Sequence, residues 1–238
     1  MASAGIKSAS RKSQVGGRST GGKSDASTRD LILDTALKAF AEKGFDGAST
    51  RSIANQAGVN QGLIPYYFGS KQALWREAVD RAFARLDDAM GNLDLRDGES
   101  PVAPIDKDAA AIVIRRYVDF VAAHPEFVCL MNEEGKRAGP RMEWLAERHV
   151  RPWLKGLEGL LSRVGQSSDR VSHVNPIHFS YIFLGAVSLL FHQAHECRHA
   201  AGYDPMMPDA IEAHADALVE LFLGDARLGT GKSQENRN

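Results

Sequence analysis

The chain has 238 residues, of which 43% are hydrophobic and 25% are charged. This length and apolar content suffice for a buried core in one larger or two smaller domains. No apolar run is long enough to span a bilayer and no hydrophobic secretory signal stands at the start, so we expect a cytoplasmic protein without a membrane partner. The two cysteines, Cys129 and Cys197, argue against a disulfide-dense secreted fold.

Charge is distributed unevenly along the chain. The formal net charge is -1, yet residues 1–29 carry +5 and the remainder carries -6. Residues 1–27 are mostly Ser, Gly, Lys and Ala. These side chains bury too little apolar surface to offset the conformational entropy lost on folding, so we predict a disordered basic arm there. One basic end on an acidic body is expected where that end faces nucleic-acid phosphates. The arm is then either a sequence-indifferent DNA contact or an inert leader.

A first helix is predicted over residues 28–43. Thr28 can cap its start, and Gly44 is suited to end it. Arg29, in the first turn, could reach a backbone phosphate. The apolar residues that share its inner face at helical spacing are Ile32, Ala36, Ala39 and Phe40.

The central motif of the sequence is a pair of short helices joined by a tight turn. Ser49 or Thr50 can cap the first helix, whose apolar stripe consists of Ile53, Ala54 and Ala57. Gly58 can adopt the left-handed conformation that closes a helix, and Asn60 can cap a second helix that starts at Gln61. Two helices around a short glycine-containing turn are typical of a helix-turn-helix.

The second helix of this motif has two different faces. Ile64 and Phe68 point toward a core, whereas the opposite face carries no charge and little bulk. The residues of that outer face are Gly62, Pro65, Tyr66 and Gly69. Pro65, as the fifth residue, would remove one backbone hydrogen bond and either tighten or bend the helix. A third helix follows, with Lys71 in its first turn, where exposed amides and the ammonium could hold a phosphate together.

Residues 50–74 read T-x-x-I-A-x-x-A-G-V-x-x-G-x-x-x-Y-Y-F-x-S-K-x-x-L. This pattern resembles the N-terminal DNA-binding domain of the TetR family of transcriptional regulators, and residues 31–45 resemble the first helix of that family. Pro65 departs from the family, in which many members carry an aromatic residue there. The resemblance implies a homodimeric DNA-binding regulator, most often a repressor, whose C-terminal helical domain holds a small-molecule effector.

We predict that one group of side chains contacts the bases of double-stranded DNA and that another group contacts its phosphates. The side chains expected to meet base edges in the major groove are Gln61, Gly62, Leu63 and Tyr66. Those expected to hold phosphates are Thr50, Arg51, Tyr67 and Lys71. Gln61 is the best candidate for a direct base contact, because its amide can pair with adenine. Asn60 and Pro65 complete the predicted interface.

The remainder of the chain shows helical periods separated by breakers, without the alternation of a strand. A connecting helix over 70–92 and a break at 98–104 are followed by predicted helices over 107–123, 125–137, 140–164, 176–201 and 208–223. The predicted fold class is all-α, with about nine helices. Its parts are a DNA-binding domain (28–74), a larger regulatory and dimerisation domain (75–224) and a disordered tail (225–238).

Two apolar strips near the end of the chain predict a homodimer, because two helices from each of two chains can close a four-helix bundle. The alternative is that both strips face their own domain's core. The strips consist of Ile177, Tyr181, Leu184, Ser188 and Phe191 on one helix and of Ile211, Ala215, Leu218 and Phe222 on the other. In the TetR family the last two helices are the usual dimer interface, which favours the dimer.

Aromatic and polar side chains of the middle helices are the candidates for binding an unknown small-molecule effector. Plain core packing is the alternative role for each of them. These residues are Tyr117, Phe120, Met131, Trp144, Trp153, His178 and Phe179.

One motif permits a different chemistry. Residues 195–199 read H-E-C-R-H, and H-E-x-x-H on a helix puts His195 and His199 on one face to hold zinc, with Glu196 as the base. His192 joins that face. The alternative function is therefore a metal-responsive regulator or a zinc-dependent hydrolase, and the competing interpretation is a solvated helix end. The sequence contains no other catalytic pattern, so we predict a repressor that is not an enzyme and needs no cofactor.

Overall fold

The computed structural model describes residues 21–91, 107–165 and 174–224, and every regular element in these ranges is a helix. The predicted all-α fold class is confirmed for this part of the chain. Three sequence predictions lie outside the described residues, namely the arm over 1–20, the break at 98–104 and the tail over 225–238.

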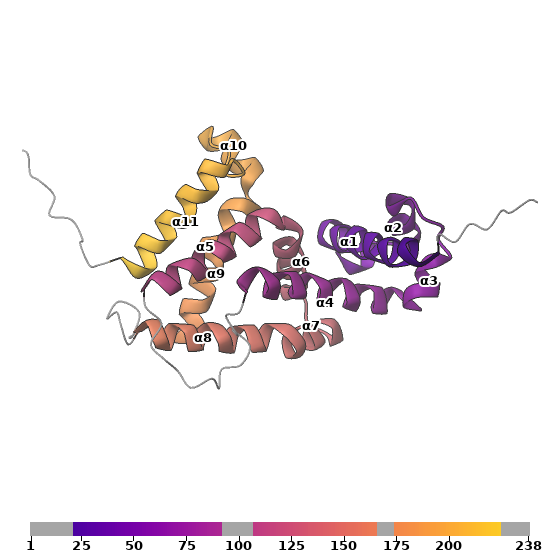
Figure 1. The fold of residues 1–238 in the computed structure, drawn as a ribbon, viewed down its shortest axis with the longest axis horizontal. Coiled ribbons are helices and arrows are strands. Elements are labelled where there is room, and N and C mark those ends of the chain that lie inside the picture. Colours follow the sequence, from indigo (N-terminus) through magenta and orange to yellow (C-terminus); the bar gives the residue numbers. More distant parts are fainter. Residues whose placement is uncertain (1–20, 92–106, 166–173, 225–238) are drawn as a thin grey trace, which may run out of the picture.

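The helices form a small N-terminal unit and a larger C-terminal unit. The small unit contains α1 (Gly21–Gly47), α2 (Thr50–Ala57) and α3 (Leu63–Phe68), and α4 (Lys71–Met90) leads out of it. The larger unit contains α5 (Lys107–Ala123), α6 (Pro125–Gly135), α7 (Pro140–Leu145), the π-helical η1 (Ala146–Val150), α8 (Arg151–Gly165), α9 (Pro176–His192), α10 (Ala194–Ala201) and α11 (Pro208–Leu223). In Figure 1, α1 to α3 lie at one end of the molecule, α9 to α11 lie at the other, and α4 runs between them.

Ion pairs and an apolar core both fasten α4 to α1. Arg81 donates to Asp30 at 2.8 Å and to Asp34 at 3.0 Å, and Arg85 donates to Asp34 at 2.6 Å. Partly exposed ion pairs contribute little each, so the main stabilisation comes from side chains buried between the helices. Those with the least exposure include Ile32, Phe40, Leu74, Trp75 and Val79.

The first helix begins earlier than the sequence predicts. α1 starts at Gly21 rather than at Thr28, so residues 21–27 are helical in place of the predicted disordered arm. Extending an existing helix adds a backbone hydrogen bond for each residue fixed, whereas nucleating one is costly, so an anchored helix can continue into polar residues. At the other end Gly44 (φ 67°, ψ 171°) interrupts the helix, as predicted.

The predicted helix over 140–164 is divided into α7, η1 and α8. In η1 the amide of Arg151 donates to the carbonyl of Ala146, five residues earlier. Pro152 gives the physical reason, because it has no amide hydrogen and its ring would collide with the carbonyl of Arg148 in a regular helix. A single wider turn avoids that collision.

The predicted helix over 176–201 is also divided. It breaks at Gln193 (φ -99°, ψ 26°), and α9 and α10 are bent by 67° relative to each other. The described ranges therefore hold eleven α-helices and η1, rather than about nine helices in all. Over the same ranges no single helix has the length and hydropathy to cross a membrane; the α9–α10 pair passes that test only as a bent unit.

Aromatic rings fill the core of the larger unit. The ring of Tyr117 on α5 lies 5.7 Å from that of Trp153 on α8 and 5.9 Å from that of Phe183 on α9. Phe222 of α11 lies edge-on to Phe179 and Phe183, at 5.3 and 5.5 Å. α5 is thus surrounded by α8, α9 and α11, and α4 also packs against it.

Candidate nucleic-acid interface

Local caps shape α2, the turn and α3. The hydroxyl of Ser49, rather than that of Thr50, caps α2 by accepting from the amide of Ser52 at 3.0 Å. Gly58 (φ 66°, ψ 29°) closes α2 in the left-handed conformation, as predicted. Asn60 Oδ1 accepts from the amide of Gly62 at 2.8 Å in the turn before α3, but the N-cap of α3 is Gly62 and no side chain caps it, so the predicted cap by Asn60 on a helix from Gln61 is wrong.

The position at which α3 starts determines how Pro65 affects the hydrogen bonds of this helix. α3 begins at Leu63 rather than at Gln61, so Pro65 is its third residue and lies in the first turn. Amides in the first turn of a helix have no intrahelical acceptor, and a proline there removes no hydrogen bond. The predicted loss of a hydrogen bond and the resulting tightening or bend therefore do not apply.

The two faces of α3 are those that the sequence predicts. Ile64 and Phe68 are buried. Leu63 and Tyr67 are half-buried against the core, which limits how far they can reach outward. The exposed residues on α3 and beside its ends include Gln61, Gly62, Pro65, Gly69 and Tyr66, the last with 76% of its surface accessible.

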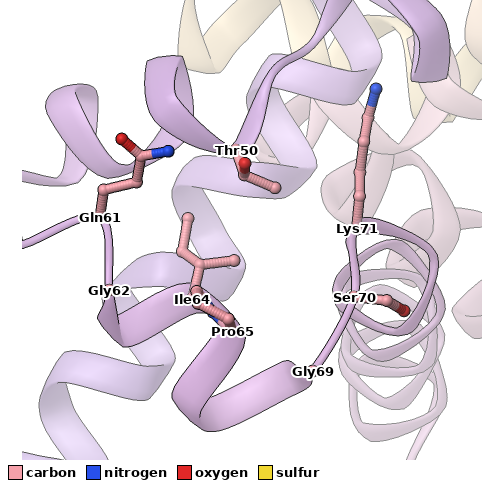
Figure 2. A pocket seen from close by; sticks show the side chains of 8 residues that line it. All are labelled: Thr50, Gln61, Gly62, Ile64, Pro65, Gly69, Ser70 and Lys71. Atoms are coloured by element: carbon pink, nitrogen blue, oxygen red, sulfur yellow. The ribbon is translucent and has the colours of Figure 1, made fainter.

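A hollow of about 550 Å³ opens between the starts of α2, α3 and α4 (Figure 2). It is lined by Thr50, Gln61, Gly62, Ile64, Pro65, Gly69, Ser70 and Lys71. Figure 2 shows the side-chain amide of Gln61 directed toward Thr50 across the mouth of this hollow. Apart from Lys71 the lining is uncharged, and its amide and hydroxyl groups can both donate and accept hydrogen bonds.

Lys71 stands at the rim of this hollow, in the first turn of α4. Its ammonium is directed away from Pro65 and Gly69 (Figure 2). It donates to the carbonyl of Asp46 at 3.5 Å and lies 4.5 Å from the ring centroid of Phe45. An ammonium has three donors, so this arrangement still permits a phosphate contact. Sequence reasoning missed the contacts of Phe45 and Asp46 with Lys71, because only the folded end of α1, after Gly44, brings them to Lys71.

The two arginines of the N-terminal unit that could bind phosphate differ in availability. Arg51 on α2 is exposed. Arg29 on α1 forms an ion pair with Glu77 on α4, and its guanidinium lies 5.3 Å from the ring centroid of Phe68 at the end of α3. Arg29 therefore joins three helices, instead of extending toward a phosphate as the sequence suggests.

The two predicted dimer strips differ in exposure. On α9, Ile177 and Tyr181 are exposed and Leu184 and Ser188 are half-buried, but Phe191 is buried. On α11 the strip is turned toward α5, with Ile211 half-buried and with Ala215, Leu218 and Phe222 buried. The α11 strip thus faces its own domain's core, which is the alternative that the sequence left open. The apolar residues that α9 exposes are Ile177, Tyr181, Ile182 and Leu189.

The predicted effector residues are only partly brought together. Tyr117, Trp153 and Phe179 are buried, and burial raises the pKa of Tyr117. The rings of Tyr117 and Phe179 lie next to Phe183, and the ring of Trp153 lies next to Tyr117. Phe120 is buried against Phe127, and Met131 is half-buried. Trp144 lies apart from them, 5.4 Å from the ring of Trp75 on α4. His178 is exposed on α9, so it is not buried with that cluster.

The residues of the H-E-x-x-H motif do not assemble a metal site. His195 and His199 are exposed on α10, and His199 Nδ1 lies 2.7 Å from the carbonyl of His195. His192 lies across the bend on α9, with Nδ1 3.6 Å from Cys129 Sγ. Burial, followed by nearby carboxylates, raises the pKa of Cys129 and disfavours the thiolate that a metal needs. Within the described ranges no three His, Cys, Asp or Glu side chains are grouped to hold a metal ion.

Known proteins resemble the N-terminal part of this chain in sequence. The family model described as bacterial regulatory proteins, tetR family, matches residues 32–78. The HTH-type transcriptional repressor NicS of Pseudomonas putida is 33% identical over 114 residues, which are 47% of this chain and 50% of NicS. The chain thus spans about half the length of the curated relatives it matches.

Two solved structures share the fold over most of the chain. One is AibR in complex with isovaleryl coenzyme A and operator DNA, with a TM-score of 0.62, 17% identity and coverage of 83% of this chain and 98% of that one. The other is FadR from Bacillus subtilis in complex with stearoyl-CoA, with a TM-score of 0.57, 19% identity and coverage of 81% and 96%.

The fold and the interface define a helix-turn-helix protein in which one long helix connects the motif to a larger helical domain. Residues 32–78 thus match the tetR family of bacterial regulatory proteins, and the chain shares its fold with a TetR-like transcriptional regulator from Rhodococcus.

Proposed function

We propose that the protein is a sequence-specific transcriptional regulator, a repressor that binds a near-palindromic operator as a homodimer and releases it when a small molecule binds. The observation that carries this proposal is the exposed, uncharged face of α3 beside a hollow whose rim holds Lys71. NicS is named as a repressor, and the AibR structure contains operator DNA, which supports the same role for this chain.

Recognition of DNA is divided between base edges and phosphates. Gln61 and Tyr66 are exposed on the face that can enter the major groove, and Gly62 allows the backbone to come close. Thr50, Arg51 and Lys71 surround that face and can contact the sugar-phosphate backbone, which sets the register of α3.

The shortness of the recognition helix α3 favours a homodimer. α3 has six residues, and a single short helix reads too few base pairs for a unique site. A second copy adds another half-site about 34 Å along the duplex. The exposed apolar face of α9 is the surface that a second copy would cover, in an isologous contact.

The buried aromatic cluster of Tyr117, Trp153 and Phe179 is the proposed effector site. Among the described residues, Trp153 Nε1 and Ser180 Oγ are buried polar groups without a hydrogen-bond partner. An unpaired buried donor costs about 1–3 kcal/mol, and a largely apolar ligand with acceptor atoms would recover that free energy. The ligand would lower DNA affinity to the extent that it binds the DNA-free form more tightly.

Selection from random DNA tests the proposal. The purified chain is incubated with duplexes of about 30 base pairs that carry a randomised centre, and the bound duplexes are sequenced. We expect enrichment of a near-palindrome whose half-sites are separated by about one helical turn. A helical protein that coats DNA through its basic residues would bind without enriching any sequence, and that result would refute specific recognition.

A further inference from the structure

The C-terminal unit contacts the end of α1, after the interruption at Gly44, through the α6–α7 corner, which we define as residues 134–141. Arg137 Nη1 lies 3.4 Å from the carboxylate of Asp46. Arg141 Cζ lies 4.2 Å from the ring centroid of Phe45. Phe45 and Asp46 are also the two residues that hold the ammonium of Lys71. The corner and the rim of the DNA-facing hollow therefore share the same two neighbours.

Arg141 is held in place by the C-terminal unit itself. Its Nε lies 3.2 Å from Glu134 Oε2, and Glu134 on α6 is only 3% exposed. A buried carboxylate is costly unless it is paired, so Glu134 restrains the guanidinium near this position. The planar guanidinium is then presented to Phe45 from α7, while its partner carboxylate lies on α6.

The ring of Phe45 contacts both the guanidinium of Arg141 and the ammonium of Lys71. Its ring stacks on Phe40 at 5.8 Å and lies edge-on to Trp75 at 6.4 Å, so it is fixed from the inside. Arg141 and Lys71 both lie within cation–π distance of this ring, one from each unit. If Arg141 were lost, Phe45 would lose this cation–π contact with the C-terminal unit, and the preferred position of the Lys71 ammonium would be less defined.

We propose that Arg141 is a positioning residue for DNA binding, which acts through Phe45 to hold Lys71 at the rim of the DNA-facing hollow. The inference rests on the proposed function, since the position of Lys71 matters only when a duplex is bound. It also makes the α6–α7 corner a point at which the C-terminal unit controls affinity. The corner shares a hollow of about 160 Å³ with Gln72 in the first turn of α4, so a shift of α6 has room to change this contact.

A double-mutant cycle tests the proposal on the full chain. Binding to a fluorescent random-sequence duplex is measured over a range of salt concentrations for the wild type, Arg141→Met, Lys71→Met and the double variant. We expect Arg141→Met to weaken binding about fivefold, as the loss of one cation–π contact predicts. It should also lower the slope of log K against log salt toward that of Lys71→Met, by up to about 0.9. The double variant should bind no more weakly than Lys71→Met alone.

Lys136→Met is the matched control, because it removes one positive charge from the same corner. The Lys136 ammonium pairs with Glu133 at 3.0 Å, on the exposed side. This control should change affinity less than about twofold. Arg141→Lys should recover part of the loss, since an ammonium can still contact the Phe45 ring. A merely structural role would give no such selective change in the salt slope.

Two results would overturn the positioning role: Arg141→Met behaves like Lys136→Met, or the losses from Arg141→Met and Lys71→Met add. If Arg141→Met fails to fold, Phe45→Leu replaces it in the cycle, because leucine keeps the apolar packing and removes the ring. Additive losses from Phe45→Leu and Lys71→Met would contradict the inference equally. Failure of the wild type to bind any duplex would refute the proposed function, whereas a salt-dependent loss from Lys71→Met without one from Arg141→Met refutes only the positioning role.

Discussion

Gln61 and Lys71 border the same hollow, yet their side chains are held in different ways. Gln61 is exposed and its amide is directed toward Thr50 (Figure 2). The ammonium of Lys71 instead contacts the ring of Phe45 and the carbonyl of Asp46. An amide presents a donor and an acceptor in a fixed plane and can match the edge of one base. An ammonium is a point charge that attracts any phosphate. Sequence preference and overall affinity should therefore depend on different residues.

This difference gives a prediction for two single variants. Gln61→Ala should reduce the preference for the selected operator over a mismatched duplex by about tenfold and leave the salt slope unchanged. Lys71→Ala should weaken binding to every duplex and reduce the slope of log K against log salt by about one. Fluorescence anisotropy with matched and mismatched duplexes at several salt concentrations measures both effects. An equal loss from both variants on all duplexes would contradict the division of labour.

The sequence predicts those residue contacts that lie within one turn of the chain. The cap formed by Gly58 was predicted correctly, because it bonds backbone groups close by in the chain. The sequence did not reveal the contact of Lys71 with Asp46, which is 25 positions away, because it forms only after α1 packs on α4. The phosphate roles of Arg51 and Lys71 stay predictions.

At the scale of the elements, breaks inside helices were harder to place than the helices themselves. Pro152 is visible in the sequence and would have marked the π-turn, since a proline inside a helical pattern displaces the backbone before it. The bend at Gln193 has no proline or glycine at its site, so the local sequence does not predict it. The break nevertheless matters, because it puts His192 on α9 and His195 and His199 on α10, and among the described residues no three potential metal ligands are grouped.

The π-turn has a structural consequence that can be measured. It brings His149 Nε2 to 2.8 Å from Asp80 Oδ1 on α4, and the imidazole stacks on Phe83 at 4.3 Å. Because His149 is buried, Asp80→Ala removes the acceptor of a buried donor and should lower the free energy of unfolding by about 1–3 kcal/mol. The midpoint of thermal unfolding, followed by circular dichroism, should fall by roughly 3–10 °C.

Asp216→Ala is the control for this variant, because Asp216 forms an exposed ion pair with Arg115. Its loss should change the free energy of unfolding by less than about 1 kcal/mol. If both variants are destabilised to the same small extent, then the contact between η1 and α4 does not contribute to stability as argued.

For the whole molecule, periodicity predicts that helices bury apolar strips but not which partner covers them. A strip at 3.6-residue spacing looks the same whether it faces its own core or a second chain. The strip on α11, with Ala215 and Leu218, is covered by α5 of the same chain. On α9 the chain leaves Tyr181 at 62% exposure and Ile182 and Leu189 at 58% each. Large apolar side chains clustered on one helix of a folded domain mark a surface that another molecule covers.

Ile182→Glu tests whether that molecule is a second copy of this chain. The side chain is exposed in the single chain, so the charge should leave the fold of each subunit intact, whereas a dimer across α9 would bury two like charges near its symmetry axis. We expect sedimentation equilibrium to change from dimer to monomer at micromolar concentration. Affinity for the selected operator should fall by at least about a hundredfold, because one subunit loses the benefit of the second half-site. Leu31→Glu, which places the same charge on an exposed leucine of α1, should still sediment as a dimer. A dimer that survives both Ile182→Glu and Leu189→Glu would mean that α9 is not the interface and that the spacing of the two α3 helices is set by another face.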